Sequence, residues 1–189
     1  MEINLFWSAC SNDGCYMLLE KPIGRILFDI INCDKKFMEF FCRDVLKATD
    51  FLPQEIETAK VDMGKYFLDL FIETDRQIIP IEIKVEARDQ DKQCHRYLQT
   101  ARQKNKNVPS RLYYLTKDKH KPSPNSLNGE KIFENNLKAV GNNDGVILVS
   151  YQDEILSWLE NCSQELKNNN EKYLSVQLEF LKDMIRKNL

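Results

Sequence analysis

The chain has 189 residues, of which 42% are hydrophobic and 30% are charged, and its formal net charge is -2. This composition indicates one globular domain and excludes a disordered or fibrous protein. The net charge excludes a global attraction to nucleic acid, so a nucleic-acid role needs a local basic patch. The longest apolar runs are too short to span a membrane, and the N-terminus lacks the features of a signal peptide. We therefore expect a cytoplasmic protein.

The N-terminal half of the chain predicts two helices followed by three strands. Apolar residues recur at helical spacing over about residues 22–32 and 35–48. Candidate strands follow at about 54–62, 65–73 and 78–86. The segments "DMGK" and "ETDRQ" between the strands are typical of hairpin turns, so we predict an antiparallel meander.

From Asp89 the pattern changes to helical spacing, and we predict a helix to about Lys104 with Asp89 as its cap. The strand "RLYYLT" follows, and then the loop "KDKHKPSPNSLNGEK", whose composition argues against regular structure. "DGVILVSY" is a last strand, and it leads into the helices "QDEILSWLENC" and "EKYLSVQLEFLKDMIRK". This order predicts a single α/β domain over residues 1–189, with helices packed on a mixed sheet. It comprises N-terminal helices (1–50), a core (54–150) and C-terminal helices (151–189).

The third predicted strand has an unusual distribution of charge. From Ile79 to Val85 the apolar residues fall on odd positions, while Glu82 and Lys84 share the other face. The ordinary interpretation of this pair is a cross-strand charge pair on a half-exposed sheet, worth about 1 kcal/mol at most.

The second predicted strand carries one carboxylate among apolar residues. Alternation places Leu68, Leu70 and Ile72 on one face and Asp69, between two phenylalanines, on the other. A carboxylate in the middle of such a strand is costly unless it is paired or binds a metal. If "ETDRQ" joins the two strands as a hairpin, Asp69 comes close to Glu82. A hard cation such as Mg²⁺ would then relieve the repulsion between the two acids.

Further along, Gln93 and Tyr97 share a helix face because they are four residues apart. By themselves they could be a surface amide and a core tyrosine. With "LDLFI" and "IEIK", however, the chain resembles the D…E-x-K core of the PD-(D/E)XK nuclease superfamily. "QCHRY" is similar to the Q-x-x-x-Y motif of its RecB-like members. "RDQDKQCHRYLQ", "RLYYLT" and "VSYQDEILSWLENC" also resemble a bacterial PD-(D/E)XK family that reads approximately "DQ..QL.RY", "YLT" and "SY.DI..WL".

The resemblance implies a restriction-endonuclease-like core and a metal-dependent nuclease that hydrolyses phosphodiester bonds of nucleic acid, in our interpretation DNA. It implies that Asp69, Glu82 and the backbone carbonyl of Ile83 hold Mg²⁺ or Mn²⁺. Lys84, on the strand face of Glu82, would stabilise the attacking water or the negative charge that develops on phosphorus.

Two further contributions to the site follow from the resemblance. Gln93 and Tyr97 would orient the metal ligands and the nucleic-acid backbone from the helix. An upstream glutamate is also expected, to complete a second cation site or to position water. We take Glu57 rather than Glu55, because Glu57 is nearer to the strand that faces Asp69.

The basic segment after this helix is the candidate nucleic-acid surface. Phosphate contacts are expected from its cations: Arg102, Lys104, Lys106, Lys117, Lys119 and Lys121. Because the segment has no evident element for reading bases, we expect little sequence specificity. The ordinary interpretation of such a charge run is a solvated helix end and loop.

Other functions stay open. A non-catalytic module could keep the nuclease fold to bind nucleic acid or a protein, although the intact set of predicted site residues argues against a decayed site. The last helix, with an apolar stripe from Leu174 to Ile185, could serve an interaction protein, although such a stripe is more often core. A protein partner or a homo-oligomer is compatible with each of these functions.

Overall fold

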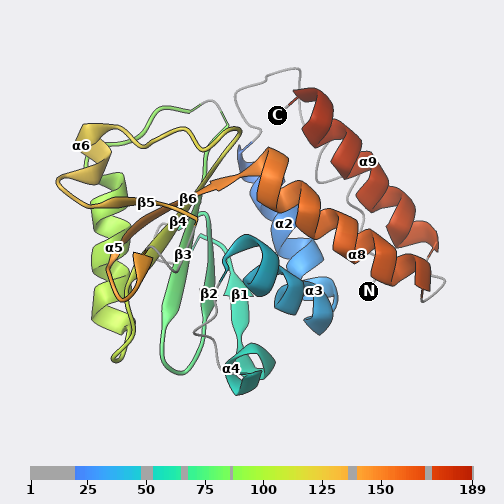
Figure 1. The fold of residues 1–189 in the computed structure, drawn as a ribbon, viewed down its shortest axis with the longest axis horizontal. Helices are drawn as coiled ribbons and strands as arrows, with labels where there is room; N and C mark the ends of the chain where they lie inside the picture. Colours follow the sequence, from blue (N-terminus) through green and yellow to red (C-terminus); the bar gives the residue numbers. More distant parts are fainter. Residues whose placement is uncertain are drawn as a thin grey trace.

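The computed structural model describes most of the chain, in six segments: residues 20–47, 53–64, 68–85, 87–135, 140–168 and 172–188. A six-stranded mixed sheet with the order β1-β2-β3-β4-β6-β5 forms its centre (Figure 1). The strands are β1 (Lys60–Asp62), β2 (Leu70–Glu73), β3 (Ile78–Ile83), β4 (Arg111–Thr116), β5 (Ile132–Glu134) and β6 (Gly145–Ser150). β1, β2 and β3 pair antiparallel, which confirms the predicted meander, whereas β3, β4, β6 and β5 pair parallel.

Helices cover both faces of this sheet, which confirms the predicted α/β architecture. α5 and α6 lie on one side of the sheet in Figure 1, and α2, α3, α8 and α9 lie on the other. The longer helices are α2 (Glu20–Cys33), α5 (Gln93–Lys104), α8 (Leu156–Asn168) and α9 (Lys172–Asn188). The shorter ones are α3 (Lys35–Phe40), α4 (Pro53–Thr58), α6 (Pro124–Leu127) and the π-helical turns η2 (Phe41–Val45) and η4 (Tyr151–Ile155). No helix in the described part of the chain is both long enough and apolar enough to cross a membrane.

The alternation of β3 separates two hydrophobic cores. Its odd-numbered residues, among them Ile81 and Ile83, join the larger core beneath α2, α3, α8 and α9. The opposite face of the sheet packs against Cys94, Leu98 and Ala101 of α5, which are all fully buried. Glu82 therefore lies on a face that α5 covers. The predicted odd–even division of this strand is confirmed, but the face that carries Glu82 is buried and not half-exposed.

The apolar stripe of α9 belongs to the larger core. Leu178, Leu181 and Ile185 are buried there, and the partly buried Leu174 packs against them. α9 contacts α8, which is fixed in turn by Trp158, whose indole Nε1 donates a hydrogen bond to the backbone oxygen of Phe37 at 3.0 Å. This stripe therefore stabilises the domain.

The predictions for the first and second strands were partly wrong. Residues 53–58 form α4, so only the last three residues of the predicted strand 54–62 are extended. Pro53 takes the first helical position, where its missing N–H is not needed. In the second strand the chain bends at Asp69, and β2 begins at Leu70; residues 65–67 lie outside the described segments. Because of this bend, Leu68 packs in the core beside α5 and not on the face of Leu70, as alternation predicted.

Other element boundaries also differ from the prediction. The helix predicted over 35–48 consists of α3 followed by η2, and it ends at Val45. The strand predicted over 78–86 ends at Ile83. Residues 48 and 86 lie outside the described segments. α5 begins at Gln93 after Lys92, whose φ of 52° breaks the helical conformation, so Asp89 is not its cap.

The segment predicted to be a loop after β4 contains regular structure. It includes α6, whose cap is Ser123: its side chain accepts a hydrogen bond from the backbone nitrogen of Ser126. β5 follows the loop, and the sequence did not reveal it. This three-residue edge strand forms by pairing with β6 and has too few residues to show a pattern of its own.

Candidate active site

Asp69, Glu82 and the residues that bond Glu82 form the candidate site, which we call the acidic cluster. It lies where β2 begins and β3 ends. In the antiparallel register Leu70 is opposite Ile81, so the next residue outward on each strand places Asp69 opposite Glu82. The Asp69 carboxylate accepts a hydrogen bond from the backbone nitrogen of Ile83 at 3.1 Å. This bond holds Asp69 against the end of β3, although Asp69 is not in a strand itself. The structure therefore brings together the two carboxylates that the hairpin argument paired.

Glu82 is the most buried member of the cluster, with 1% of its surface exposed. Its Oε1 accepts hydrogen bonds from Lys84 Nζ at 2.8 Å and from Gln93 Nε2 at 2.7 Å. Its Oε2 is buried and has no hydrogen-bond partner among the described residues. Burial, and then the negative charge of Asp69, raise the pKa of Glu82 to about 8, although Lys84 acts in the opposite direction. Glu82 thus keeps its proton more readily than usual, and a further positive charge is needed for both acids to be ionised together.

Gln93 and Tyr97 approach Glu82 from the first turns of α5. The Gln93 amide has two N–H donors, and its nitrogen lies 2.7 Å from Glu82 Oε1 and 3.2 Å from the Tyr97 hydroxyl. Its carbonyl oxygen accepts a hydrogen bond from the backbone nitrogen of Gln90 at 3.2 Å, which fixes the orientation of the amide. Burial, and then the charge of Glu82, raise the pKa of Tyr97 to about 12. Tyr97 is therefore a neutral phenol at physiological pH.

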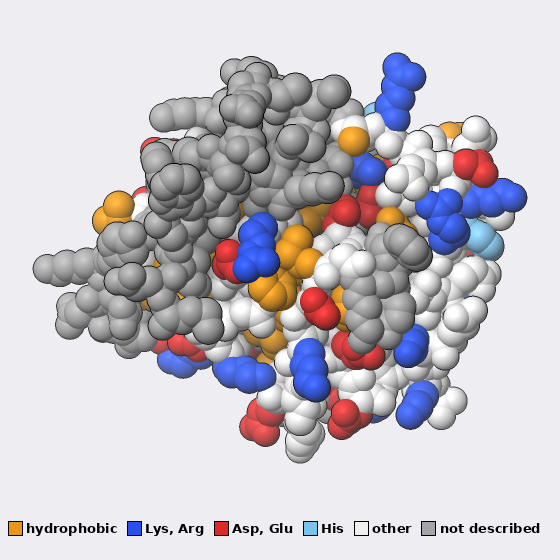
Figure 2. Space-filling view, turned by 180° about the vertical axis from the view of Figure 1, so that it is seen from behind, with side chains coloured by type: hydrophobic (Ala, Val, Ile, Leu, Met, Phe, Trp, Pro, Cys, Tyr) orange, Lys and Arg blue, Asp and Glu red, His pale blue; other side chains and the backbone are white. Residues whose placement is uncertain are grey.

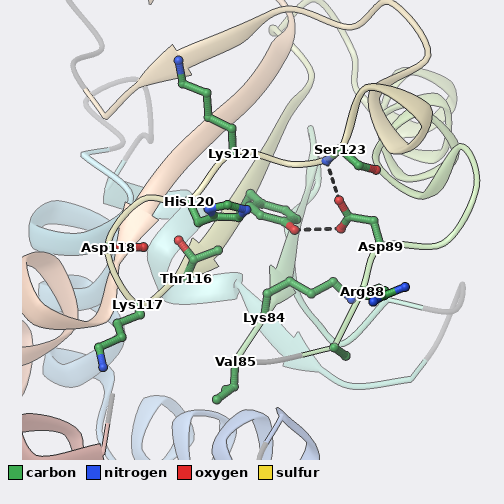
Figure 3. Close-up of a pocket in the computed structure, with 12 residues that line it drawn as sticks. Lys84, Val85, Arg88, Asp89, Thr116, Lys117, Asp118, His120, Lys121 and Ser123 are labelled. Carbon is green, nitrogen blue, oxygen red and sulfur yellow. Dashed lines mark hydrogen bonds between the residues drawn. The ribbon is translucent and has the colours of Figure 1, made fainter.

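Lys84 follows the last residue of β3 and joins the acidic cluster to a cavity. Its backbone nitrogen donates a hydrogen bond to the Leu115 carbonyl at 2.9 Å, so the chain stays aligned with β4 beyond the end of the strand. The cavity has a volume of 570 Å³, and Lys84, Tyr114 and Thr116 contribute to its wall (Figure 3). Lys84 therefore stands between the carboxylates and a space that can hold a ligand.

The structure does not bring the predicted upstream glutamate to this cluster. Glu57 is exposed on α4, next to the start of β1. Because β1 and β2 are antiparallel, the start of β1 lies beside the end of β2. Asp69 lies at the other end, where β2 begins. Glu55 is buried and accepts hydrogen bonds from Thr74 Oγ1 at 3.0 Å and Arg76 Nη1 at 3.4 Å, which is a structural contact. The choice of Glu57 depended on a strand over 54–62, and α4 replaces most of that strand.

The basic segment is divided between the two ends of the sheet. Arg102, Lys104 and Lys106 lie at the end of α5, beside the start of β3, because Asn105 Oδ1 accepts a hydrogen bond from the backbone nitrogen of Ile78. Arg102 is held there by two acids: its guanidinium makes two hydrogen bonds to Glu130, at 2.7 and 2.8 Å, and one to Asp144 at 2.9 Å. These cations lie far from the acidic cluster.

The remaining predicted cations lie near the carboxyl end of β4. Lys117 and Lys121 line the cavity, whereas Lys119 forms ion pairs with Asp153 at 3.1 Å and Glu154 at 3.2 Å. On the face shown in Figure 2, Lys and Arg side chains alternate with Asp and Glu and do not gather in one basic patch. The cavity, and not a broad surface, is therefore the place where predicted cations meet the acidic cluster.

Arg88 and Thr116 line the cavity and were not among the predicted site residues. Arg88 lies in the connection before α5, and Thr116 is the last residue of β4. A signal for Thr116 was present in the sequence, because ligands of α/β sheets bind beyond the carboxyl ends of parallel strands. No comparable pattern distinguishes Arg88.

The donor set of the cluster fits a hard divalent cation. Two carboxylates, from Asp69 and Glu82, and the backbone carbonyl of Ile83 offer the oxygen ligands that Mg²⁺ prefers. Across the described segments no group of three or more His, Cys, Asp and Glu side chains forms a metal site. Mg²⁺ is commonly held by one or two carboxylates, with water and substrate phosphate as its other ligands, so two carboxylates suffice. The buried Oε2 of Glu82 is the acceptor that a cation would satisfy.

A mixed sheet flanked by helices, with a Glu-x-Lys pair where its third strand ends, defines a restriction-endonuclease-like α/β domain. Comparison with known families agrees with this class: the model of the PD-(D/E)XK nuclease superfamily matches residues 27–182. The chain belongs to this superfamily, whose members are generally nucleases and typically use divalent metal ions. No curated protein and no solved structure matches the chain. The narrower resemblance to RecB-like members stays a prediction.

Proposed function

We propose that this protein is a Mg²⁺- or Mn²⁺-dependent nuclease that hydrolyses phosphodiester bonds of nucleic acid, DNA in particular, with little sequence specificity. The observation that carries the proposal is the buried Oε2 of Glu82, which has no hydrogen-bond partner among the described residues and lies in a group that Asp69 repels. A buried acceptor without a donor is costly, and two close carboxylates need a cation or a proton between them. A divalent cation resolves both problems at once.

In this proposal Asp69, Glu82 and the backbone carbonyl of Ile83 hold the cation. A cation held there would supply the chemistry that hydrolysis needs, by polarising the scissile phosphate and lowering the pKa of a water molecule. The protein supplies a fixed geometry: the hydrogen bond from Ile83 to Asp69 holds one carboxylate, and the bond from Gln93 holds the other. Neither carboxylate has to reorganise when substrate arrives.

Lys84 supplies the positive charge of the site. Its ammonium lies 2.8 Å from Glu82 Oε1 and lines the cavity, so it can reach both the metal ligand and a bound phosphate. Negative charge grows on the phosphate oxygens during hydrolysis, and an ammonium fixed nearby stabilises the transition state more than the ground state.

Gln93 and Tyr97 position these groups. The neutral Tyr97 hydroxyl and the Gln93 amide form a short chain of hydrogen bonds that ends on Glu82. Such partners of metal ligands fix the ligand orientation, and their loss weakens metal affinity or activity.

The decisive experiment compares wild-type protein with Glu82→Gln on single- and double-stranded DNA, circular DNA and RNA, with Mg²⁺, Mn²⁺ or EDTA. Asp62→Asn is a matched control, because Asp62 is an exposed acid where β1 ends, at the same end of the sheet. We expect metal-dependent cleavage that Glu82→Gln abolishes and Asp62→Asn retains. Mn²⁺ should raise the Tm of wild-type protein but not of Glu82→Gln. A folded wild-type protein that neither cleaves nor gains stability with either metal would instead be the non-catalytic binding module.

A further inference from the structure

The cavity beside Lys84 is a separate space from the acidic cluster and has the size of a small-molecule site. Its volume of 570 Å³ falls within the range of about 300–1,000 Å³ that is typical of ligand pockets. A space of this size can take one nucleotide. A double helix is too large to fit inside a space of this size.

The wall of the cavity favours an anion. It carries four cations (Lys84, Arg88, Lys117 and Lys121) against two carboxylates (Asp89 and Asp118). Lys84 is paired with Glu82, whereas the other three cations form no ion pair with any residue that the structure describes. Asp89 is already engaged, since it accepts hydrogen bonds from the Tyr114 hydroxyl at 2.7 Å and the Ser123 nitrogen at 2.6 Å (Figure 3). In Figure 3, however, the charged ends of Arg88, Lys117 and Lys121 point away from one another. They therefore surround the cavity with positive charge but do not form a ready-made phosphate site.

A second and independent observation is the state of Thr116. This residue is only 4% exposed, and its Oγ1 has no hydrogen-bond partner within the described segments. It lines the cavity at the carboxyl end of β4 (Figure 3). A buried hydroxyl without a partner costs free energy, and such groups are rare unless a ligand or water satisfies them. Because a hydroxyl both donates and accepts, Thr116 can bond a sugar hydroxyl or a base edge.

We propose that this cavity binds one unpaired nucleotide of the substrate strand, with its sugar or base on Thr116 Oγ1 and its phosphate at the rim, attracted by the positive charge of Arg88, Lys117 and Lys121. The inference rests on the proposed nuclease function and narrows its substrate class. Lys84 joins the cavity to the acidic cluster, so the bound nucleotide lies next to the scissile phosphate. The enzyme then acts on strands that are unpaired at this position: single strands, or duplex ends that fray.

Binding can be measured without cleavage. Wild-type protein in EDTA is titrated by calorimetry with deoxyadenosine 5′-monophosphate, and in parallel with deoxyadenosine and with inorganic phosphate. We expect saturable binding of the nucleotide at one site. Deoxyadenosine and inorganic phosphate should each bind at least tenfold more weakly, because each makes only part of the contacts. No binding of the nucleotide, or phosphate binding as tight as the nucleotide, overturns the proposal.

Two variants separate the contacts. Lys121→Glu should weaken nucleotide binding about tenfold or more, because it replaces an attractive charge with a repulsive one. Thr116→Val should weaken it about fivefold, which is the scale of one hydrogen bond. Thr116→Val should fold normally, since the hydroxyl it removes has no partner in the described protein. Lys60→Glu, an exposed lysine at the start of β1 and the opposite end of the sheet, is the control and should bind like wild type. Wild-type affinity in both cavity variants overturns the proposal.

Glu82→Gln separates this inference from the nuclease function. In EDTA it should still bind the nucleotide, although its cleavage is lost. If Glu82→Gln lacks cleavage while wild-type protein does not bind the nucleotide, the cavity proposal fails and the nuclease function stands. If the nucleotide binds as expected and wild-type protein shows no metal-dependent cleavage, the nuclease function fails and the binding site stands. With active enzyme, a single-stranded oligonucleotide should be cut at least tenfold faster than the same sequence in a covalently closed duplex circle, which has no ends to fray. Equal rates overturn the substrate class.

Discussion

The side-chain amide of Gln93 donates a hydrogen bond of 2.7 Å to the buried Oε1 of Glu82. Both side chains are more than nine-tenths buried, and the bond joins α5 to the end of β3. Its strength comes from the buried surroundings, where no water competes for the bond. Because Lys84 donates to the same oxygen, Oε2 is the oxygen that remains available to a cation.

This contact predicts the effect of Gln93→Ala. Loss of the amide removes one of the two hydrogen bonds to Glu82 Oε1, and it also removes the hydrogen bond between Gln93 and Tyr97. We expect cleavage to fall about 10- to 100-fold, as is common when a partner of a metal ligand is removed. The concentration of Mn²⁺ needed for half-maximal activity should rise in parallel. Gln99→Ala, an exposed glutamine on the same helix, is the control. Equal cleavage by Gln93→Ala and Gln99→Ala would contradict the positioning role.

Lys84 gives a prediction that separates chemistry from metal binding. Lys84→Ala removes the ammonium beside Glu82 Oε1 but keeps both carboxylates. We expect cleavage to fall at least about 100-fold, the scale of one preorganised electrostatic contact. The rise in Tm with Mn²⁺ should persist, because the donors of the cation are intact. If Lys84→Ala loses the Tm response and regains activity at high Mn²⁺, the lysine organises the metal site and does not stabilise the transition state.

The sequence predicted the site best where a regular period determined the geometry. Alternation in β3 gave the shared face of Glu82 and Lys84, and the four-residue spacing on α5 gave Gln93 and Tyr97. Asp69 was expected close to Glu82 and lies there, although it lies in a bend and not within a strand. The pairing register of β2 and β3 brings Asp69 to Glu82, and the alternation of side chains along a strand does not.

The rest of the site depends on contacts between segments that are distant in sequence. Thr116 reaches the cavity because β4 pairs in parallel with β3, and Arg88 reaches it through an irregular connection. Ion pairs are equally invisible to composition: Arg102 counts as one more cation in the sequence, but in the fold Glu130 holds it. Short elements are the hardest case, because the six residues of α4 show no helical period and were taken for a strand.

The position of Glu57 predicts that its loss is harmless to activity. It is exposed on α4, at the end of the sheet opposite to Asp69, so Glu57→Ala should cleave DNA within about twofold of wild type and should melt within the small range typical of surface substitutions. Glu55→Ala should instead lower the Tm, because it removes the partner of Thr74 Oγ1. Parallel melting and cleavage assays distinguish the two variants. A loss of cleavage in Glu57→Ala, with normal melting, would show that Glu57 does contribute to the active site as the upstream glutamate.

The contact of Arg102 with Glu130 predicts a stability that depends on pH. Two hydrogen bonds from the Arg102 guanidinium, and a further one with His95, hold the pKa of Glu130 below its usual value of 4.5, although partial burial opposes them. The folded state therefore binds this proton less readily than the unfolded state. The stabilisation is fully present above about pH 4.5 and is lost as the pH falls through the lower pKa of the folded state.

Glu130→Gln should consequently lower the free energy of unfolding by about 1–3 kcal/mol at pH 7. Lys131→Ala, which removes an exposed neighbouring side chain, is the control. In urea titrations the difference between Glu130→Gln and wild type should shrink progressively below pH 4.5, because protonated Glu130 resembles glutamine in charge. Cleavage at pH 7 and a temperature where both proteins are folded should be unchanged, because the side chain of Glu130 bonds His95 and Arg102 and no residue of the acidic cluster. A difference in stability that stays constant from pH 7 to pH 3 would show that shape, and not charge, accounts for the contribution of Glu130.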